Sequence, residues 1–145
     1  MKYKIELKTN IVNDGYKRMP SLEDIKLVID KYSFGFKGIV LFHDSLYDYT
    51  FDTKLNNYHN VDSNMVIGNI TKTIIEDNKL YLIVDCVKDL DLDEKYICTF
   101  RAKLKSSIKN DKFVFDSIEM ISVDLIIVEK NVTVLEKDLS EITKY

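Results

Sequence analysis

Apolar and charged residues alternate at the start of the chain. In residues 2–11, Tyr3, Ile5 and Leu7 alternate with charged positions, which is the period of a half-buried β-strand. The segment does not show the basic stretch followed by an apolar block that is typical of a signal peptide. We therefore expect residues 2–11 to form a strand with one face on the core and the other in water.

A helical period follows this strand. Ser21 is a suitable N-cap, and Asp24 stands three residues later, in the position of the capping-box acid. Gly35 supplies a stop signal. These signals predict one amphipathic helix at about 22–33, lying across a sheet. Its apolar stripe consists of Leu22, Ile25, Val28, Ile29 and Tyr32.

The period then changes to two. The apolar run at 39–42 and the alternating segment 47–52 predict a hairpin that turns at 43–45. Residues 53–64 have no period and predict the longest loop of the chain. A loop of this length often carries function.

The strongest hairpin signal lies in the middle of the sequence. Two apolar-rich segments, 65–75 and 80–87, flank a polar four-residue turn at 76–79. We expect these two segments to pair as antiparallel strands.

More strands are predicted in the second half. Residues 96–105 alternate, 106–111 form a turn, 113–118 return the chain, and 120–128 are rich in β-branched residues. The apolar residues of 134–142 fit helical spacing and predict a short C-terminal helix, although their Val and Thr content is also compatible with a strand.

These elements indicate a β-dominated α+β fold formed by one globular domain, residues 1–145. We expect about seven or eight strands in a mostly antiparallel sheet, curled or folded into two layers. Parallel winding of the nucleotide-binding type needs several helices between strands, and after residue 35 the predicted strands follow one another through turns alone.

The charge composition argues against nucleic-acid binding. The net charge is −3, and among 21 basic residues only Arg18 and Arg101 are arginines. Arginine is the residue that reads phosphates and base edges with a bidentate fork, whereas lysine is a hydrated point charge. No apolar run approaches the roughly 20 residues of a membrane span, so we expect no membrane partner.

Candidate catalytic residues are few. His43, Asp44 and Ser45 are the only cluster of triad-type residues, and His59 is the other histidine. An Asp next to the His in sequence seldom reaches the far imidazole nitrogen, and His-Asp-Ser is also an ordinary polar turn. No phosphate loop or other catalytic motif occurs, so the chain does not read as an enzyme.

The metal candidates are also incomplete. Asp89, Asp91 and Asp93 resemble the opening of a calcium loop, but the glycine and the final glutamate of such a loop are missing. Cys86 and Cys98 lack zinc-knuckle spacing and read as unpaired, buried thiols. We expect no metal and no cofactor.

Tyrosine is the remaining signal. Nine tyrosines occur, and Tyr47, Tyr49 and Tyr58 lie in or near the predicted loop. Tyrosine is favoured at protein interfaces and equally in half-buried sheets. The sequence favours a non-enzymatic protein-interaction domain that binds itself or another protein.

Abundant Lys, Asn and Ile with little Arg are typical of proteins encoded by AT-rich DNA. We take this composition to favour a phage or prophage source, and within it a virion or capsid-associated structural protein. Such a protein would reside in the bacterial cytoplasm or in the virion. The alternatives are a phage-type inhibitor of host or defence machinery, a small hydrolase, and a ligand-binding β-barrel.

Overall fold

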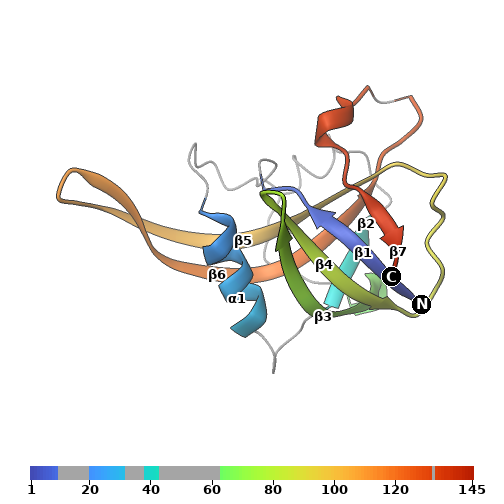
Figure 1. Ribbon diagram of the computed structural model, residues 1–145, viewed down its shortest axis with the longest axis horizontal. Coiled ribbons are helices and arrows are strands. Elements are labelled where there is room, and N and C mark those ends of the chain that lie inside the picture. The colour runs from blue at the N-terminus through green and yellow to red at the C-terminus, as the bar shows by residue number, and fades with distance from the viewer. Residues whose placement is uncertain (10–19, 32–37, 43–62, 132) are drawn as a thin grey trace.

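The strands form one sheet that curls on itself (Figure 1). The computed structural model describes residues 1–9, 20–31, 38–42, 63–131 and 133–145. The sheet has seven strands in the order β4-β3-β2-β6-β5-β1-β7, and β1 pairs with β4 as well. The elements are β1 (Lys2–Leu7), α1 (Leu22–Lys31), β2 (Gly38–Phe42), the 3-10 turn η2 (Ser63–Met65), β3 (Val66–Glu76), β4 (Lys79–Cys86), β5 (Tyr96–Lys109), β6 (Lys112–Ile127), the 3-10 turn η3 (Glu136–Asp138) and β7 (Ile142–Lys144).

The extra pairing between β1 and β4 closes the sheet into a ring. β4 occupies the whole of one edge of β1, from the pair Lys2 and Asp85 to the pair Leu7 and Leu80. The other edge of β1 meets β5 in parallel at Leu7 and Cys98. Among the described strands, β2 with β6 is the second parallel pairing, and the others are antiparallel. The expected mostly antiparallel, curled sheet is therefore confirmed; two separate layers are not.

The C-terminal segment completes the seam of the ring between β1 and β5. On one side, Glu6 N–H donates to the carbonyl of Glu141 at 2.9 Å, and β7 continues along β1. On the other side, Ser140 N–H donates to the carbonyl of Tyr96 at 2.9 Å, and its hydroxyl accepts from Cys98 N–H at 2.7 Å. The C-terminal residues therefore form hydrogen bonds with both strands, because the direct pairing of β1 and β5 is short: Leu7 pairs with Cys98, and Lys8 N–H donates to the Cys98 carbonyl at 2.7 Å.

Curvature of the ring is aided by a close approach of two strands at Gly68. A Cβ atom on Gly68 would lie 2.5 Å from the carbonyl oxygen of Asp85 on β4. The β2–β3 register shifts beside it, and the β3–β4 register shifts between Ile70 and Lys72. Such bulges bend a strand and increase its twist, and a glycine without a side chain permits the contact.

Alternate residues of the strands fill the interior. The core includes Tyr3, Ile5 and Leu7 of β1, all almost fully buried. Facing strands contribute Leu80, Leu82, Val84, Cys98, Phe100 and Leu125. Helix α1 and the connection from β4 to β5 lie at opposite ends of the ring (Figure 1).

Helix α1 confirms the predicted start at Leu22, and it is described to Lys31. The N-cap is also confirmed, because Ser21 Oγ accepts from Asp24 N–H at 3.2 Å. The helix buries Ile25 and Ile29 against the same core as the strands. The predicted last two residues of the helix, 32–33, lie outside the described residues.

The β3–β4 hairpin confirms the strongest strand signal. Asp77 and Asn78 form its turn with φ of 50° and 61°. Asp and Asn tolerate this left-handed region better than most residues, and such turns match the twist of paired strands.

The second hairpin is longer than predicted. The expected turn at 106–111 is wrong: residues 106–109 continue β5, and the turn is formed by Asn110 and Asp111 with φ of 50° and 62°. The segments 113–118 and 120–128, predicted as separate strands, belong largely to the single strand β6.

Of two further predictions, the C-terminal helix is not confirmed and the strand at 39–42 is. The short C-terminal helix is not confirmed, because the tail holds the single turn η3 followed by strand β7. The strand predicted at 39–42 is confirmed as part of β2, which pairs with β3 and β6. Its predicted hairpin partner at 47–52 and the loop at 53–62 lie outside the described residues.

Candidate functional site

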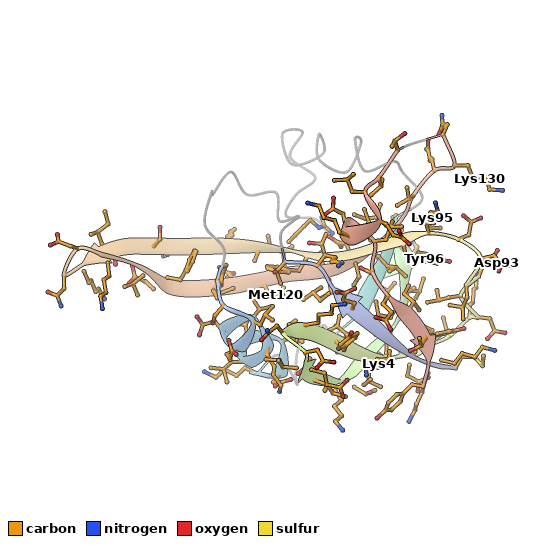
Figure 2. The ribbon with its side chains drawn as sticks, turned by 45° about the horizontal axis from the view of Figure 1, so that its top comes forward. Lys4, Asp93, Lys95, Tyr96, Met120 and Lys130 are labelled. Atoms are coloured by element: carbon orange, nitrogen blue, oxygen red, sulfur yellow. The ribbon has the colours of Figure 1, made fainter. Side chains whose placement is uncertain are left out.

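The ends of β5 and β6 leave the ring together as a two-stranded arm. The ribbon projects well past α1 (Figure 1), and the side chains near its tip lie away from the other described elements (Figure 2). We define the arm as residues 103–119, from the pair of Lys103 and Glu119 to the turn at Asn110 and Asp111. An isolated two-stranded hairpin is marginally stable in water, so this projection is the most unusual feature of the described fold.

The two faces of the arm differ in chemistry. Directly opposite residues in paired strands share a face, so the register and the alternation within each strand assign each side chain. One face continues the core side of β6 through Met120, Ile118 and Phe115 and reaches Ile108 near the tip. The other face carries charged residues, among them Lys103, Lys105, Lys109, Asp116 and Glu119.

The apolar face becomes exposed towards the tip. Met120, labelled in Figure 2, and Ile118 are half-buried and pack against the core near α1. Ile108 is 76% exposed, and Val114 on the opposite face is 37% exposed. The apolar face of the ribbon therefore ends in an exposed aliphatic side chain at the tip of the arm.

A buried charge pair holds β5 and β6 together where the arm begins. Arg101 and Asp124 lie on the face opposite the core and are 5% and 0% exposed. Arg101 Nε donates to Asp124 Oδ2 at 2.8 Å, and Nη2 donates to Oδ1 at 3.2 Å. The hydroxyl of Ser122 donates to Asp124 Oδ1 at 2.8 Å and accepts from Arg101 Nε at 2.9 Å. The register shifts directly after Arg101, so the pair fixes the two strands at a bend.

Another charged cluster surrounds Glu6 at the seam of the ring. The Glu6 carboxylate is 3.1 Å from Lys8 Nζ and 3.8 Å from Lys79 Nζ, and it accepts from Glu141 N–H at 3.1 Å. The Tyr81 hydroxyl donates to the Glu141 carboxylate at 3.5 Å. Burial raises the pKa of Tyr81, so its phenol stays protonated. These contacts tie β1 and β4 to the tail, a structural role.

A pocket of about 220 Å³ opens beside the same seam. It is lined by Leu92, Glu94, Lys95, Tyr96, Leu139, Ser140 and Ile142. Two of its polar groups have protein partners, since the Tyr96 hydroxyl donates to the Asp91 carbonyl at 3.0 Å and the Ser140 hydroxyl accepts from Cys98 N–H at 2.7 Å. Burial raises the pKa of Tyr96. The raised pKa keeps the Tyr96 phenol protonated, and its hydroxyl already serves as a structural donor.

The acidic connection between β4 and β5 is exposed, and one of its carboxylates makes a local hydrogen bond. Asp89, Asp91 and Asp93 are all exposed, and Asp91 Oδ1 accepts from Asp93 N–H at 3.0 Å. Asp93 is labelled in Figure 2 on this connection. Within the part of the chain that the structure describes, no three His, Cys, Asp or Glu side chains are grouped so that they could hold a metal ion.

The two cysteines are free thiols buried in the sheet. Burial raises the pKa of Cys86 and places that of Cys98 well above its ordinary range. A thiol is a nucleophile or a metal ligand in its ionised form, so neither cysteine is poised for chemistry.

The other residues predicted as sites lie outside the described residues. They are the catalytic candidates His43, Asp44, Ser45 and His59 and the protein-binding candidates Tyr47, Tyr49 and Tyr58. The arm itself was not predicted as a site. Its signal was present in the alternation of 96–105 and in the Asn-Asp pair at 110–111, a two-residue turn flanked by alternating strands.

No helix of the described residues is long and apolar enough to cross a membrane. Comparisons with protein-family models, curated proteins and solved structures find no match to this chain.

Proposed function

We propose that the protein is a non-enzymatic interaction domain that binds protein through the β5–β6 arm. The observation that carries the proposal is the arm itself, a projecting amphipathic ribbon whose apolar face ends in an Ile108 that is 76% exposed. Burial of this face against a partner would supply the apolar contact that a two-stranded ribbon lacks on its own.

The contrast within the molecule supports this role. The charge clusters around Glu6 and around Arg101 and Asp124 are satisfied by their own contacts. Both thiols are buried with raised pKa values, and the Tyr96 hydroxyl of the pocket is engaged by the Asp91 carbonyl. The arm, in contrast, exposes apolar and charged side chains far from the ring.

Within this class we propose a structural component of a phage or prophage particle. The support is the lysine-rich, arginine-poor composition of AT-rich coding DNA, together with an arm that could join one copy to the next. Electron microscopy of the concentrated protein checks this narrower proposal: ordered arrays, rings or tubes are expected, and dispersed single particles at every concentration would contradict it.

The experiment that tests the arm compares mass in solution for three proteins. Size-exclusion chromatography with light scattering is run over a range of concentrations for the wild type, Ile108→Asp and Val87→Asp. Val87 is the matched control because it is 79% exposed and lies just after β4, away from the arm.

We expect the wild type and Val87→Asp to associate with rising concentration and Ile108→Asp to stay monomeric. Because Ile108 is so exposed, its replacement should leave the fold intact, which circular dichroism checks. A wild type that stays monomeric, or an Ile108→Asp variant that associates like the wild type, contradicts self-association through the arm.

A further inference from the structure

The charged face of the arm is divided between its two strands. The β5 strand carries Lys103, Lys105 and Lys109. The β6 strand carries Asp116 and Glu119 over the matching length, and Lys112 beside the turn is the exception. All of these side chains are exposed. One edge of the arm is therefore basic and the other is acidic.

Both edges of the arm also present backbone hydrogen-bonding groups. Among the described strands, none pairs with the outer edge of β5 over 103–109 or with the outer edge of β6 over 116–121. An open strand edge is a template for pairing with another chain. The edge alone gives no preference for a partner, but the charge division does.

Because this preference is self-complementary, we infer that the partner of the arm is the arm of a second copy, with the basic β5 edge of one copy against the acidic β6 edge of the next. This inference rests on the proposed function and adds the identity and the orientation of the partner.

Two arms related by a two-fold axis would pair like edges. Lysines of β5 would then face lysines, or Asp116 and Glu119 would face their own copies, and like charges directly opposite one another destabilise a pair of strands. Two arms that point in the same direction place β5, which leads away from the ring, beside a β6 that returns to it. Such a pair is antiparallel, and each lysine edge meets an acidic edge.

This arrangement also places the apolar faces of neighbouring arms side by side on one surface of the combined sheet. Arms that point the same way and pair edge to edge continue one sheet, so all copies of Ile108 lie on the same side of it. Each copy uses different edges towards its two neighbours, so the contact is heterologous and continues until a ring closes or a filament forms. The inference therefore predicts assemblies of more than two copies.

Charge reversal on single edges tests the inference. The first variant makes the β5 edge acidic, with Lys103→Glu, Lys105→Glu and Lys109→Glu. The second makes the β6 edge basic, with Asp116→Lys and Glu119→Lys. Each variant alone brings like charges together between copies, and we expect each to remain monomeric at concentrations where the wild type assembles.

Mixing the two variants is the decisive step. Repulsion within each arm persists in the mixture, because Lys109 and Asp116 form an ion pair at 3.4 Å within one wild-type arm and only one member is reversed in each variant. Charges between unlike copies become complementary, however. We expect an equimolar mixture to assemble in which the two variants alternate, detected by light scattering and by energy transfer between differently labelled variants.

The outcomes separate the two proposals. If Ile108→Asp abolishes assembly but the mixture stays monomeric, or if each variant assembles alone like the wild type, the edge-to-edge arrangement is wrong and binding through the arm stands. If the wild type does not assemble at all, the edge-to-edge arrangement and self-association through the arm are both wrong, and binding of a different protein through the arm is what remains of the proposed function. Circular dichroism verifies that each variant is folded. The mixing test is then repeated with two single variants, Lys103→Glu and Glu119→Lys, which change the charge least.

Discussion

Arg101 and Asp124 form a bidentate ion pair across β5 and β6. The distances are 2.8 Å from Nε to Oδ2 and 3.2 Å from Nη2 to Oδ1, and Asp124 is fully buried. The pair lies on the sheet face opposite the core, at the point where the two strands bend and leave the ring as the arm. A guanidinium with its planar fork suits this geometry in a way that a lysine would not. The position of the arm therefore depends on a contact between two charges that are 23 residues apart.

Loss of the Asp124 charge should destabilise the protein strongly. Asp124→Asn removes the carboxylate charge that Arg101 contacts at 2.8 and 3.2 Å, and removing one member of a buried pair typically costs about 3–5 kcal/mol. The free energy of unfolding from urea titration measures the effect. The control is Asp116→Asn in the exposed pair with Lys109, for which we expect a loss below about 1 kcal/mol. Equal losses in the two variants would contradict the structural role of the buried pair.

Ser140 should contribute to stability through one hydrogen bond at the seam. Ser140→Ala removes the acceptor of Cys98 N–H, a backbone group in the fully buried part of β5, and an unsatisfied buried donor costs about 1–3 kcal/mol. Ser140→Thr keeps a hydroxyl and should recover much of the loss. The matched control is Thr143→Ala at an exposed position of β7, expected within about 0.5 kcal/mol of wild type. A Ser140→Ala protein as stable as Thr143→Ala would show that the tail does not hold the seam.

Stability should fall at alkaline pH because of the buried thiols. Burial places the pKa of Cys98 well above its ordinary range, and that of Cys86 is raised as well. In the unfolded chain a thiol ionises near pH 8.5, so the unfolded state loses its proton first. The contribution is therefore fully present below about pH 8 and is lost as the pH rises, by about 1–2 kcal/mol per strongly shifted thiol at pH 10.

Urea titrations at pH 7, 8, 9 and 10 measure this loss. Cys98→Ala lowers stability at every pH because it leaves a cavity, but its decline between pH 8 and 10 should be smaller than that of the wild type. Cys86 stays in the variant, so part of the decline remains. A decline of the same size in both proteins would exclude Cys98 as its source.

Local patterns predicted the elements whose signals are themselves local. The N-cap at Ser21, the start of α1 and the β3–β4 hairpin follow from side chains within a few residues of each other. The second hairpin was harder, because two adjacent serines at 106–107 resemble a turn although the true turn is the Asn-Asp pair at 110–111. The tail was predicted as a helix from its spacing, yet Ile142 pairs with Ile5 of β1, and such a partner lies far away in the sequence.

By itself, the sequence determined the fold class, a β-dominated α+β fold, because period-two alternation, one capped helix and tight turns are encoded by neighbouring residues. Only the tertiary structure decided that the sheet closes through β1 and β4, that the last residues fill the seam between β1 and β5, and that β5 and β6 continue into an arm. These features depend on which distant strands meet. Strand pairing is decided by burial and hydrogen bonding across the whole chain, which a local pattern does not contain.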